Sequence, residues 1–145
     1  MMDTFSDDQK VSFFSKLIFE IIFLFVSVIY VVGLHRLNNA IKFARIKPTE
    51  YFKIVQFNQY SSFKYTLGAL LLLIIVISLG VWYFAAASEN EFTRWFVLLF
   101  IGSLVINILV LIIIWNLINV PVLRAILIVG GIGAGVIVGL LSNNR

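Results

Sequence analysis

Few residues of this chain could take part in chemistry. Its 145 residues include one histidine, seven acidic residues and no cysteine. Acid–base, nucleophilic and metal chemistry each need several such groups gathered at one place. A lone His35 cannot form a histidine cluster, and most of the acids lie far from one another in the polar segments. We therefore expect no enzymatic activity, no metal site and no cofactor.

Glu20 is the acidic residue that interrupts an apolar run. It lies about one turn inside the first such run, with Lys16 one turn before it and Ser27 seven residues after it. Ionisable residues inside a membrane are rare and are candidates for function. Two interpretations remain open at this point. Glu20 either pairs with Lys16 at the membrane surface or forms an ion or proton site on the face that it shares with Ser27.

Asn107 and Ser103 form a second polar pair, near the middle of the third apolar run and one helical turn apart. A side-chain amide that faces lipid would leave its donors and acceptor unsatisfied. We expect both residues to face another helix or another copy of the chain. Membrane hydrogen bonds of this kind are worth about 0.6–2 kcal/mol, which is enough to fix helix register.

The most specific pattern in the sequence is a row of glycines near the C-terminus. Gly131, Gly135 and Gly139 are four residues apart, so they form two overlapping GxxxG units on one helix ridge. Such a ridge, or glycine zipper, lets two helix backbones approach closely. The partner is a helix of this chain, a second copy or another protein, and the pattern does not distinguish these.

The elements that would position these residues are four long apolar runs. Hydrophobic residues make up 61% of the chain, too many for an ordinary soluble domain. A helix of about 20 residues crosses a hydrocarbon core of about 30 Å. We predict an all-α integral membrane protein of one domain, residues 1–145, with spans at 17–34, 66–86, 96–117 and 121–141.

Aromatic residues mark the ends of the middle two runs. Trp and Tyr gather where a membrane meets water. Tyr65 and Trp82 are separated by about 26 Å of helix, and Trp95 and Trp115 by about 30 Å. Both separations match the thickness of a bilayer core.

The distribution of Lys and Arg predicts the orientation of the spans. Four of these residues fall on the side of the two termini, namely Lys10, Lys16, Arg94 and Arg145, and seven fall on the other side. Cytoplasmic loops are enriched in Lys and Arg. We expect both termini outside, residues 35–64 in the cytoplasm, and a location in the cell membrane, the inner membrane where there are two.

Residues 35–64 form the largest polar segment, and we predict a helical hairpin there. A helical stripe continues the first run as far as Ile46, and Pro48 with Glu50 indicates the start of a new helix. Basic residues on this hairpin could bind anionic lipid headgroups or an acidic partner. They are Arg36, Lys42, Arg45, Lys47, Lys53 and Lys64. We expect no nucleic-acid binding.

Three functions agree with these patterns. The first is an accessory or scaffold subunit that packs into a membrane complex through the glycine ridge and Asn107. The second is a homo-oligomeric pore or channel. The third is a small proton-coupled transporter in which Glu20 is the coupling residue. The expected partners are the lipid bilayer and either other membrane subunits or copies of the same chain.

Overall fold

The structure, a computed structural model, describes residues 5–118 and 120–144. These residues fold into four long α-helices, with bounds Asp7–Phe43 (α1), Tyr51–Glu89 (α2), Arg94–Leu117 (α3) and Pro121–Asn143 (α4). The all-helical prediction is confirmed. Each helix is long and apolar enough to cross a membrane, and each predicted span lies within one helix. Arg145, which the orientation count includes, lies outside the described residues.

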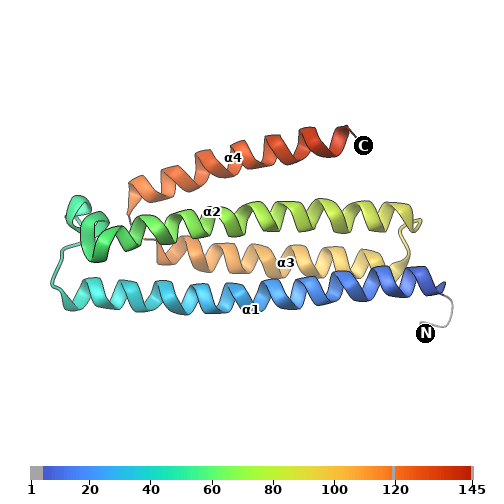
Figure 1. Cartoon of the computed structure of the whole chain (residues 1–145), viewed down its shortest axis with the longest axis horizontal. Helices are drawn as coiled ribbons and strands as arrows, with labels where there is room; N and C mark the ends of the chain where they lie inside the picture. Colours follow the sequence, from blue (N-terminus) through green and yellow to red (C-terminus); the bar gives the residue numbers. More distant parts are fainter. Residues whose placement is uncertain (1–4, 119, 145) are drawn as a thin grey trace.

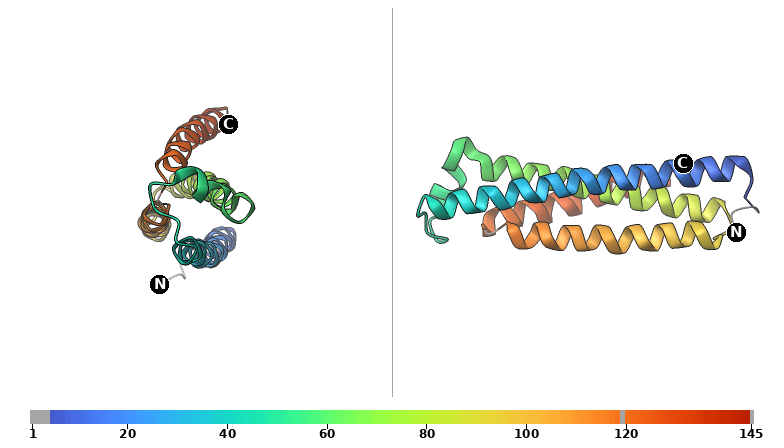
Figure 2. Two further views of the ribbon diagram at one scale, coloured as in Figure 1. Left: turned by 90° about the vertical axis from the view of Figure 1, so that its left-hand side faces the viewer. Right: turned by 90° about the horizontal axis from the view of Figure 1, so that it is seen from below.

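The helices alternate in direction along the chain (Figure 1). The starts of α1 and α3 and the ends of α2 and α4 therefore lie at one end of the molecule. Viewed end-on, α1, α2 and α3 surround a common core, whereas α4 lies outside it against α2 (Figure 2). The molecule thus consists of a three-helix unit with a fourth helix added to one side.

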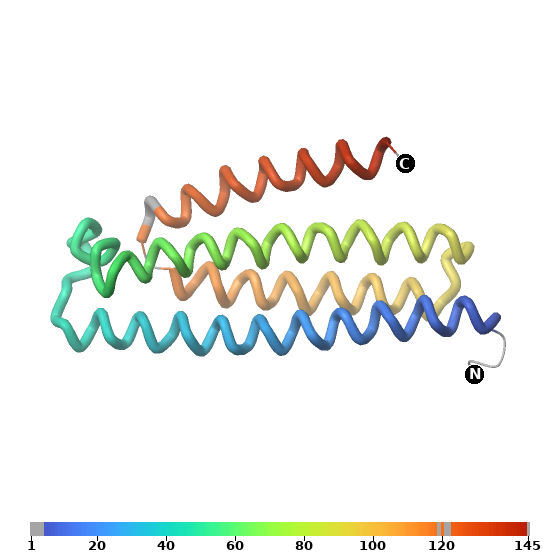
Figure 3. Tube along the Cα trace, in the orientation of Figure 1, coloured from blue at the N-terminus to red at the C-terminus, as the bar shows by residue number. Residues whose placement is uncertain are grey.

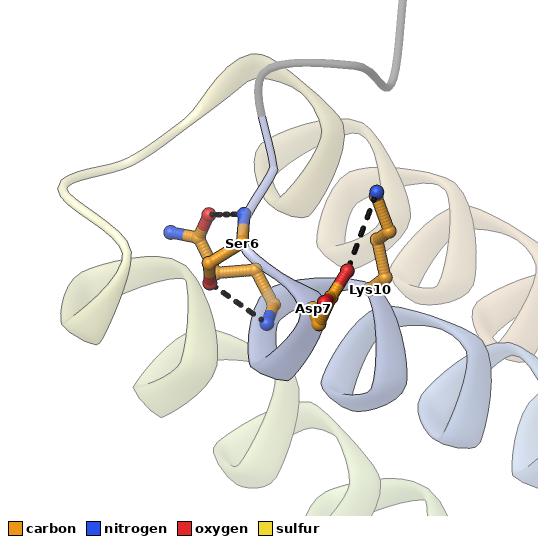
Figure 4. Close-up of polar contacts among 4 residues, drawn as sticks. Ser6, Asp7 and Lys10 are labelled. Atoms are coloured by element: carbon orange, nitrogen blue, oxygen red, sulfur yellow. Dashed lines mark hydrogen bonds and ion pairs between the residues drawn. The ribbon is translucent and has the colours of Figure 1, made fainter.

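A capping box starts α1 well before the apolar run. The Gln9 backbone N–H donates to Ser6 Oγ at 3.3 Å, and the Ser6 N–H donates to Gln9 Oε1 at 3.1 Å (Figure 4). These bonds satisfy backbone donors that a helix start leaves free. The Gln9 amide also donates to Asn90 Oδ1 at 2.9 Å, which joins the start of α1 to the end of α2. As a result, α1 extends ten residues beyond the predicted span at this end.

The helical hairpin over residues 35–64 stays a prediction, but the start of its second helix differs from the one that we expected. We expected a second helix to begin at Pro48, but α2 begins at Tyr51. Pro48 is instead within a turn: the Glu50 N–H donates to the Lys47 carbonyl oxygen, and the Lys47 N–H donates to Glu50 Oε2, both at 3.0 Å. Proline is favoured at the second position of such a turn, and it is also favoured at the first position of a helix.

A kink then interrupts α2 before the predicted span. Residues from Phe57 to Tyr60 have non-helical backbone angles, and Asn58, Gln59 and Tyr60 all have positive φ. Left-handed backbone costs about 1–2 kcal/mol per residue, so the surroundings must stabilise it. Two hydroxyl groups contribute, because Ser62 Oγ donates to the Ile54 carbonyl oxygen and Ser61 Oγ donates to that of Asn58.

The core has two parts. The larger one runs along α1, α2 and α3, with Leu123 and Leu127 from the first turns of α4, and includes Phe23, Leu72 and Ile114, each at most 5% exposed. The smaller one closes the end of the molecule near the α2–α3 connection, where Phe13 packs edge-to-face on Phe96 with 5.7 Å between ring centres. Edge-to-face contact is the favoured arrangement of two aromatic rings.

Candidate functional site

Three polar residues of α1 face the interior of the three-helix unit. Lys16, Glu20 and Ser27 are 5%, 5% and 1% exposed, although they lie on an otherwise apolar helix. Their spacing of four and seven residues places them on one face of the helix. The face that we expected Glu20 to share with Ser27 is therefore a buried face.

Glu20 is joined to the polar pair of α3 by a chain of hydrogen bonds. The Ser103 hydroxyl donates to Glu20 Oε2 at 2.9 Å, and Asn107 Nδ2 donates to Ser103 Oγ at 3.0 Å. Ser103 is 5% exposed and Asn107 is 1% exposed. Glu20, Ser103 and Asn107 thus form one buried cluster. Together with Ser27, which is buried on the same face of α1 as Glu20, we call these residues the polar seam.

The expected pairing of Lys16 with Glu20 does not form in the described part of the chain. Lys16 Nζ lies 2.8 Å from Ser12 Oγ and 4.6 Å from the centre of the Trp82 ring. Helical side chains lean toward the N-terminus of their helix, so the lysine extends back to Ser12 and away from Glu20. A charge over an aromatic face is itself favourable.

Tyr83 is a buried residue whose role the sequence did not reveal. Its hydroxyl donates to the Lys16 carbonyl oxygen at 2.9 Å, and the side chain is 1% exposed. In the sequence Tyr83 reads as part of an aromatic belt with Trp82, which is 39% exposed. The residue types alone do not distinguish a tyrosine at the membrane–water interface from a buried one that joins α1 and α2, as Tyr83 does.

A close approach of α1 and α2, which we did not predict, lies nearer the other end of the three-helix unit. Tyr30 and Tyr65 pack with 5.5 Å between ring centres, and the Tyr30 hydroxyl donates to the Tyr65 carbonyl oxygen. Each ring covers a glycine of the other helix. A Cβ at Gly68 would lie 2.9 Å from the Tyr30 ring, and one at Gly33 would clash with the Tyr65 hydroxyl.

The glycine ridge of α4 is mostly open. A Cβ at Gly131 would lie 2.6 Å from a Leu73 methyl group of α2, so this glycine is in contact. At Gly135 and Gly139, no atom from elsewhere in the described chain lies within 4 Å of such a Cβ. Among the side chains of α4 that the structure describes, from position 123 on, the buried ones are Leu123, Leu127 and Ala134. The glycine ridge therefore contacts α2 at Gly131 and is open at Gly135 and Gly139.

The end of α4 diverges from α2 (Figure 3). Residues of α2, α3 and α4 line an apolar groove of about 360 Å³. The lining residues are apolar except for the Trp115 indole, and they include Gly131, Leu73 and Leu111. No charged side chain lines this groove. It could hold an apolar group, such as a side chain of a neighbouring helix or part of a lipid tail.

The six basic residues predicted to bind lipid or a partner are all exposed. They lie at the end of the molecule that holds the kink and the turn, on α1, on residues 44–50 and on α2. Lys53 Nζ is 2.6 Å from Glu50 Oε1. This hydrogen bond, together with the one from the Lys47 N–H, lowers the pKa of the Glu50 carboxyl below its ordinary value of 4.5.

Residues 5–118 and 120–144 contain no group of three His, Cys, Asp or Glu side chains placed to hold a metal ion. Comparisons with protein-family models, with curated proteins and with solved structures return no match. The class of protein therefore follows from the chain itself. Four apolar helices of this length are the features of a membrane protein, and its function has to be inferred from its own surfaces and buried groups.

Proposed function

We propose that this chain is a non-catalytic subunit of a complex in the cell membrane, and that it binds a transmembrane helix of a partner subunit through α4. In the proposed orientation both termini lie outside, and the basic end with residues 44–50 lies in the cytoplasm beside anionic headgroups. The observation that carries the proposal is the open glycine ridge of α4.

The ridge favours a protein partner because its glycines have little use within the chain. A glycine inside a helix destabilises it by about 0.5–1 kcal/mol relative to alanine. Gly131 leaves room for the Leu73 side chain, but no atom from elsewhere in the described chain would contact a side chain placed at Gly135 or Gly139. Small residues at such positions are typical of membrane helix interfaces, where they let two backbones come close.

The neighbourhood of the ridge supports the same occupant. Two large side chains beside it, Val136 and Leu140, are more than half exposed. An incoming helix could pack its backbone against Gly135 and Gly139 and place an apolar side chain in the groove next to Gly131. Packing of this kind replaces lipid contacts with closer protein contacts, which is the main source of helix association in a bilayer.

Two substitutions on α4 test the proposal with a matched control. Gly135→Leu fills the ridge, whereas Gly133→Leu adds the same side chain about 160° away on the other side of the helix. Both positions are open in the structure, so neither leucine should disturb the fold. We expect Gly135→Leu to lower association with the partner about tenfold, equal to about 1.4 kcal/mol, and Gly133→Leu to leave it nearly unchanged.

Native mass spectrometry after mild solubilisation from the source membrane provides the measurement. The proposal predicts a complex of this chain with a different membrane protein, and it predicts loss of that complex in Gly135→Leu. A complex that contains copies of this chain alone would instead support the homo-oligomeric alternative. A monomer for the wild-type chain, or equal loss with both leucines, would contradict assembly through the ridge.

A further inference from the structure

Three buried oxygen atoms of the polar seam have no hydrogen-bond partner among the described residues. They are Glu20 Oε1, Ser27 Oγ and Asn107 Oδ1. Their side chains are at most 5% exposed. Buried polar atoms in native proteins nearly always have a partner, so several free ones on neighbouring residues indicate a missing ligand.

The direction of the hydrogen bonds determines which kind of ligand fits. Asn107 uses its amide nitrogen to reach Ser103, and Ser103 uses its proton to reach Glu20 Oε2. Each step leaves an oxygen lone pair unused: the amide oxygen of Asn107 and the second oxygen of Glu20. A ligand that satisfies both atoms must donate hydrogen bonds or carry positive charge, so a group that can only accept hydrogen bonds does not fit.

We propose that the polar seam binds one monovalent cation, Na⁺ or a proton, at Glu20. Carboxylate, amide and hydroxyl oxygens are hard ligands suited to such ions and unsuited to the transition metals that prefer nitrogen and sulfur. One carboxylate supplies one negative charge, so a monovalent cation makes the cluster neutral. A divalent ion would leave a net positive charge in an apolar interior, which is costly.

The charged and titratable neighbours agree with this charge balance. Lys16 is the basic residue on the same face of α1, but its ammonium group is held at Ser12 and Trp82 and is not paired with Glu20. Tyr83 lies close to the Glu20 carboxyl group from α2, and its hydroxyl proton is donated to the Lys16 carbonyl oxygen. On α3, Ser103 and Asn107 are both uncharged.

The depth of the seam makes the site functional in a bilayer. Ser103 is about 12 Å along α3 from Trp95, and Asn107 is about 18 Å from it. Because α1 and α3 run in the same direction (Figure 1), Asn107 lies between the levels of Glu20 and Ser27. The free oxygens therefore follow one line from Glu20 toward the middle of the helices. Carboxyl groups at such depth commonly mark ion or proton pathways.

The test is the thermal stability of the purified protein in NaCl and in choline chloride at equal ionic strength. A ligand that binds only the folded state raises the unfolding temperature in proportion to the logarithm of its concentration. We expect Na⁺ to raise that temperature by a few degrees for each tenfold increase. Glu20→Gln, which keeps an acceptor for Ser103, should abolish the effect, and the exposed Glu91→Gln should retain it.

A pH series in choline chloride distinguishes the proton from Na⁺. If the ligand is a proton, wild-type stability depends on pH in the absence of Na⁺, Glu20→Gln removes that dependence, and Na⁺ has no effect. If the ligand is Na⁺, Asn107→Leu should raise the Na⁺ dissociation constant about tenfold.

Binding of ²²Na⁺ to the wild-type protein provides a measurement that needs no variant. Saturable binding, displaced by lowering the pH, supports the proposal even if Glu20→Gln does not fold. The proposal is overturned if wild-type protein binds no ²²Na⁺ and its stability responds to neither Na⁺ nor pH. None of these results depends on α4, so a failure here and a failure of the assembly proposal are distinguishable.

Discussion

The contact between α1 and α3 and the contact between α2 and α4 are of different kinds. The first includes the hydrogen bonds of Glu20, Ser103 and Asn107. The second is formed by apolar side chains, such as Leu127 of α4 packed against the core, and it ends where the groove opens. In a bilayer, lipid competes equally well for apolar surface but cannot replace buried polar partners. We therefore expect lipid to compete with the apolar contact between α2 and α4 more readily than with the hydrogen-bonded contact between α1 and α3.

The glycines repeat this contrast. Gly33 and Gly68 are covered by tyrosine rings of the neighbouring helix, so they serve packing within the chain. Gly135 and Gly139 have open space beside them. The same residue type thus closes the three-helix unit in one place and leaves a surface free in another.

The largest expected effect is the loss of an aromatic side chain from the three-helix unit. Phe96 is 1% exposed and contacts Phe5 and Phe13. Phe96→Ala should lower the free energy of unfolding by about 3–5 kcal/mol. Unfolding of the purified protein by denaturing detergent measures the change. A loss below about 1 kcal/mol would mean that this end of the unit is not a packed core.

The next effect concerns the covered glycines. Gly33→Ala places a methyl group against the Tyr65 hydroxyl and should destabilise the protein by about 1–3 kcal/mol, because Tyr65 must move. Gly80→Ala is the matched control, since its added Cβ would meet nothing within 4 Å and alanine favours helix. Equal effects of both substitutions on unfolding would remove the contrast between covered and open glycines.

A smaller effect is expected where α4 meets the core. Leu127 is 7% exposed and lies beside the groove, so truncation enlarges an opening that already exists. We expect Leu127→Ala to lower the free energy of unfolding by about 1 kcal/mol, below the range of about 2–5 kcal/mol for truncations in a closed core, because the site can fill with lipid. Hydrogen exchange should rise in α4 and stay constant in α1 and α3. Faster exchange throughout all four helices would show that α4 is part of one cooperative unit.

The smallest effect is at the exposed turn. The hydrogen bonds from Lys53 and Lys47 lower the pKa of Glu50, so its ionised form favours the folded state. This contribution is present above the ordinary value of 4.5 and is lost as the pH falls through the lowered pKa of the folded protein. Glu50→Gln should remove that part of the acid sensitivity, with only a slight change at neutral pH. Thermal unfolding between about pH 3 and pH 6 measures it.

The helices were predictable because length and apolar composition determine them directly. The runs that hold Glu20, Asn107 and Gly135 all lie in single helices. The expectation that Asn107 and Ser103 turn away from lipid agrees with their burial. That expectation rests on the cost of an unpaired amide in an apolar medium, which holds whatever the neighbouring helix is.

Other features of the site depend on contacts between helices. Residue types and short-range spacing do not determine which helices make those contacts. Glu20 binds a residue 83 positions away, so Lys16 appeared the better partner. The turn at Pro48 and the kink at Asn58 follow from hydrogen bonds that compete with helix formation over a few residues. Tyr83 turns inward because Lys16 offers a carbonyl oxygen across the interface between α1 and α2.

The long separation between Glu20 and Ser103 also orders the biogenesis of the protein. In the proposed membrane arrangement, α1 would enter the bilayer before the segment that carries Ser103 has been translated. Until then Glu20 lacks its hydroxyl donor, and a carboxyl group without partners is poorly retained in lipid. The first helix should therefore stay beside the insertion machinery, or remain shifted toward the surface, until α3 arrives. Ribosome-bound chains truncated before Arg94 should still crosslink to that machinery through α1, and longer chains should not.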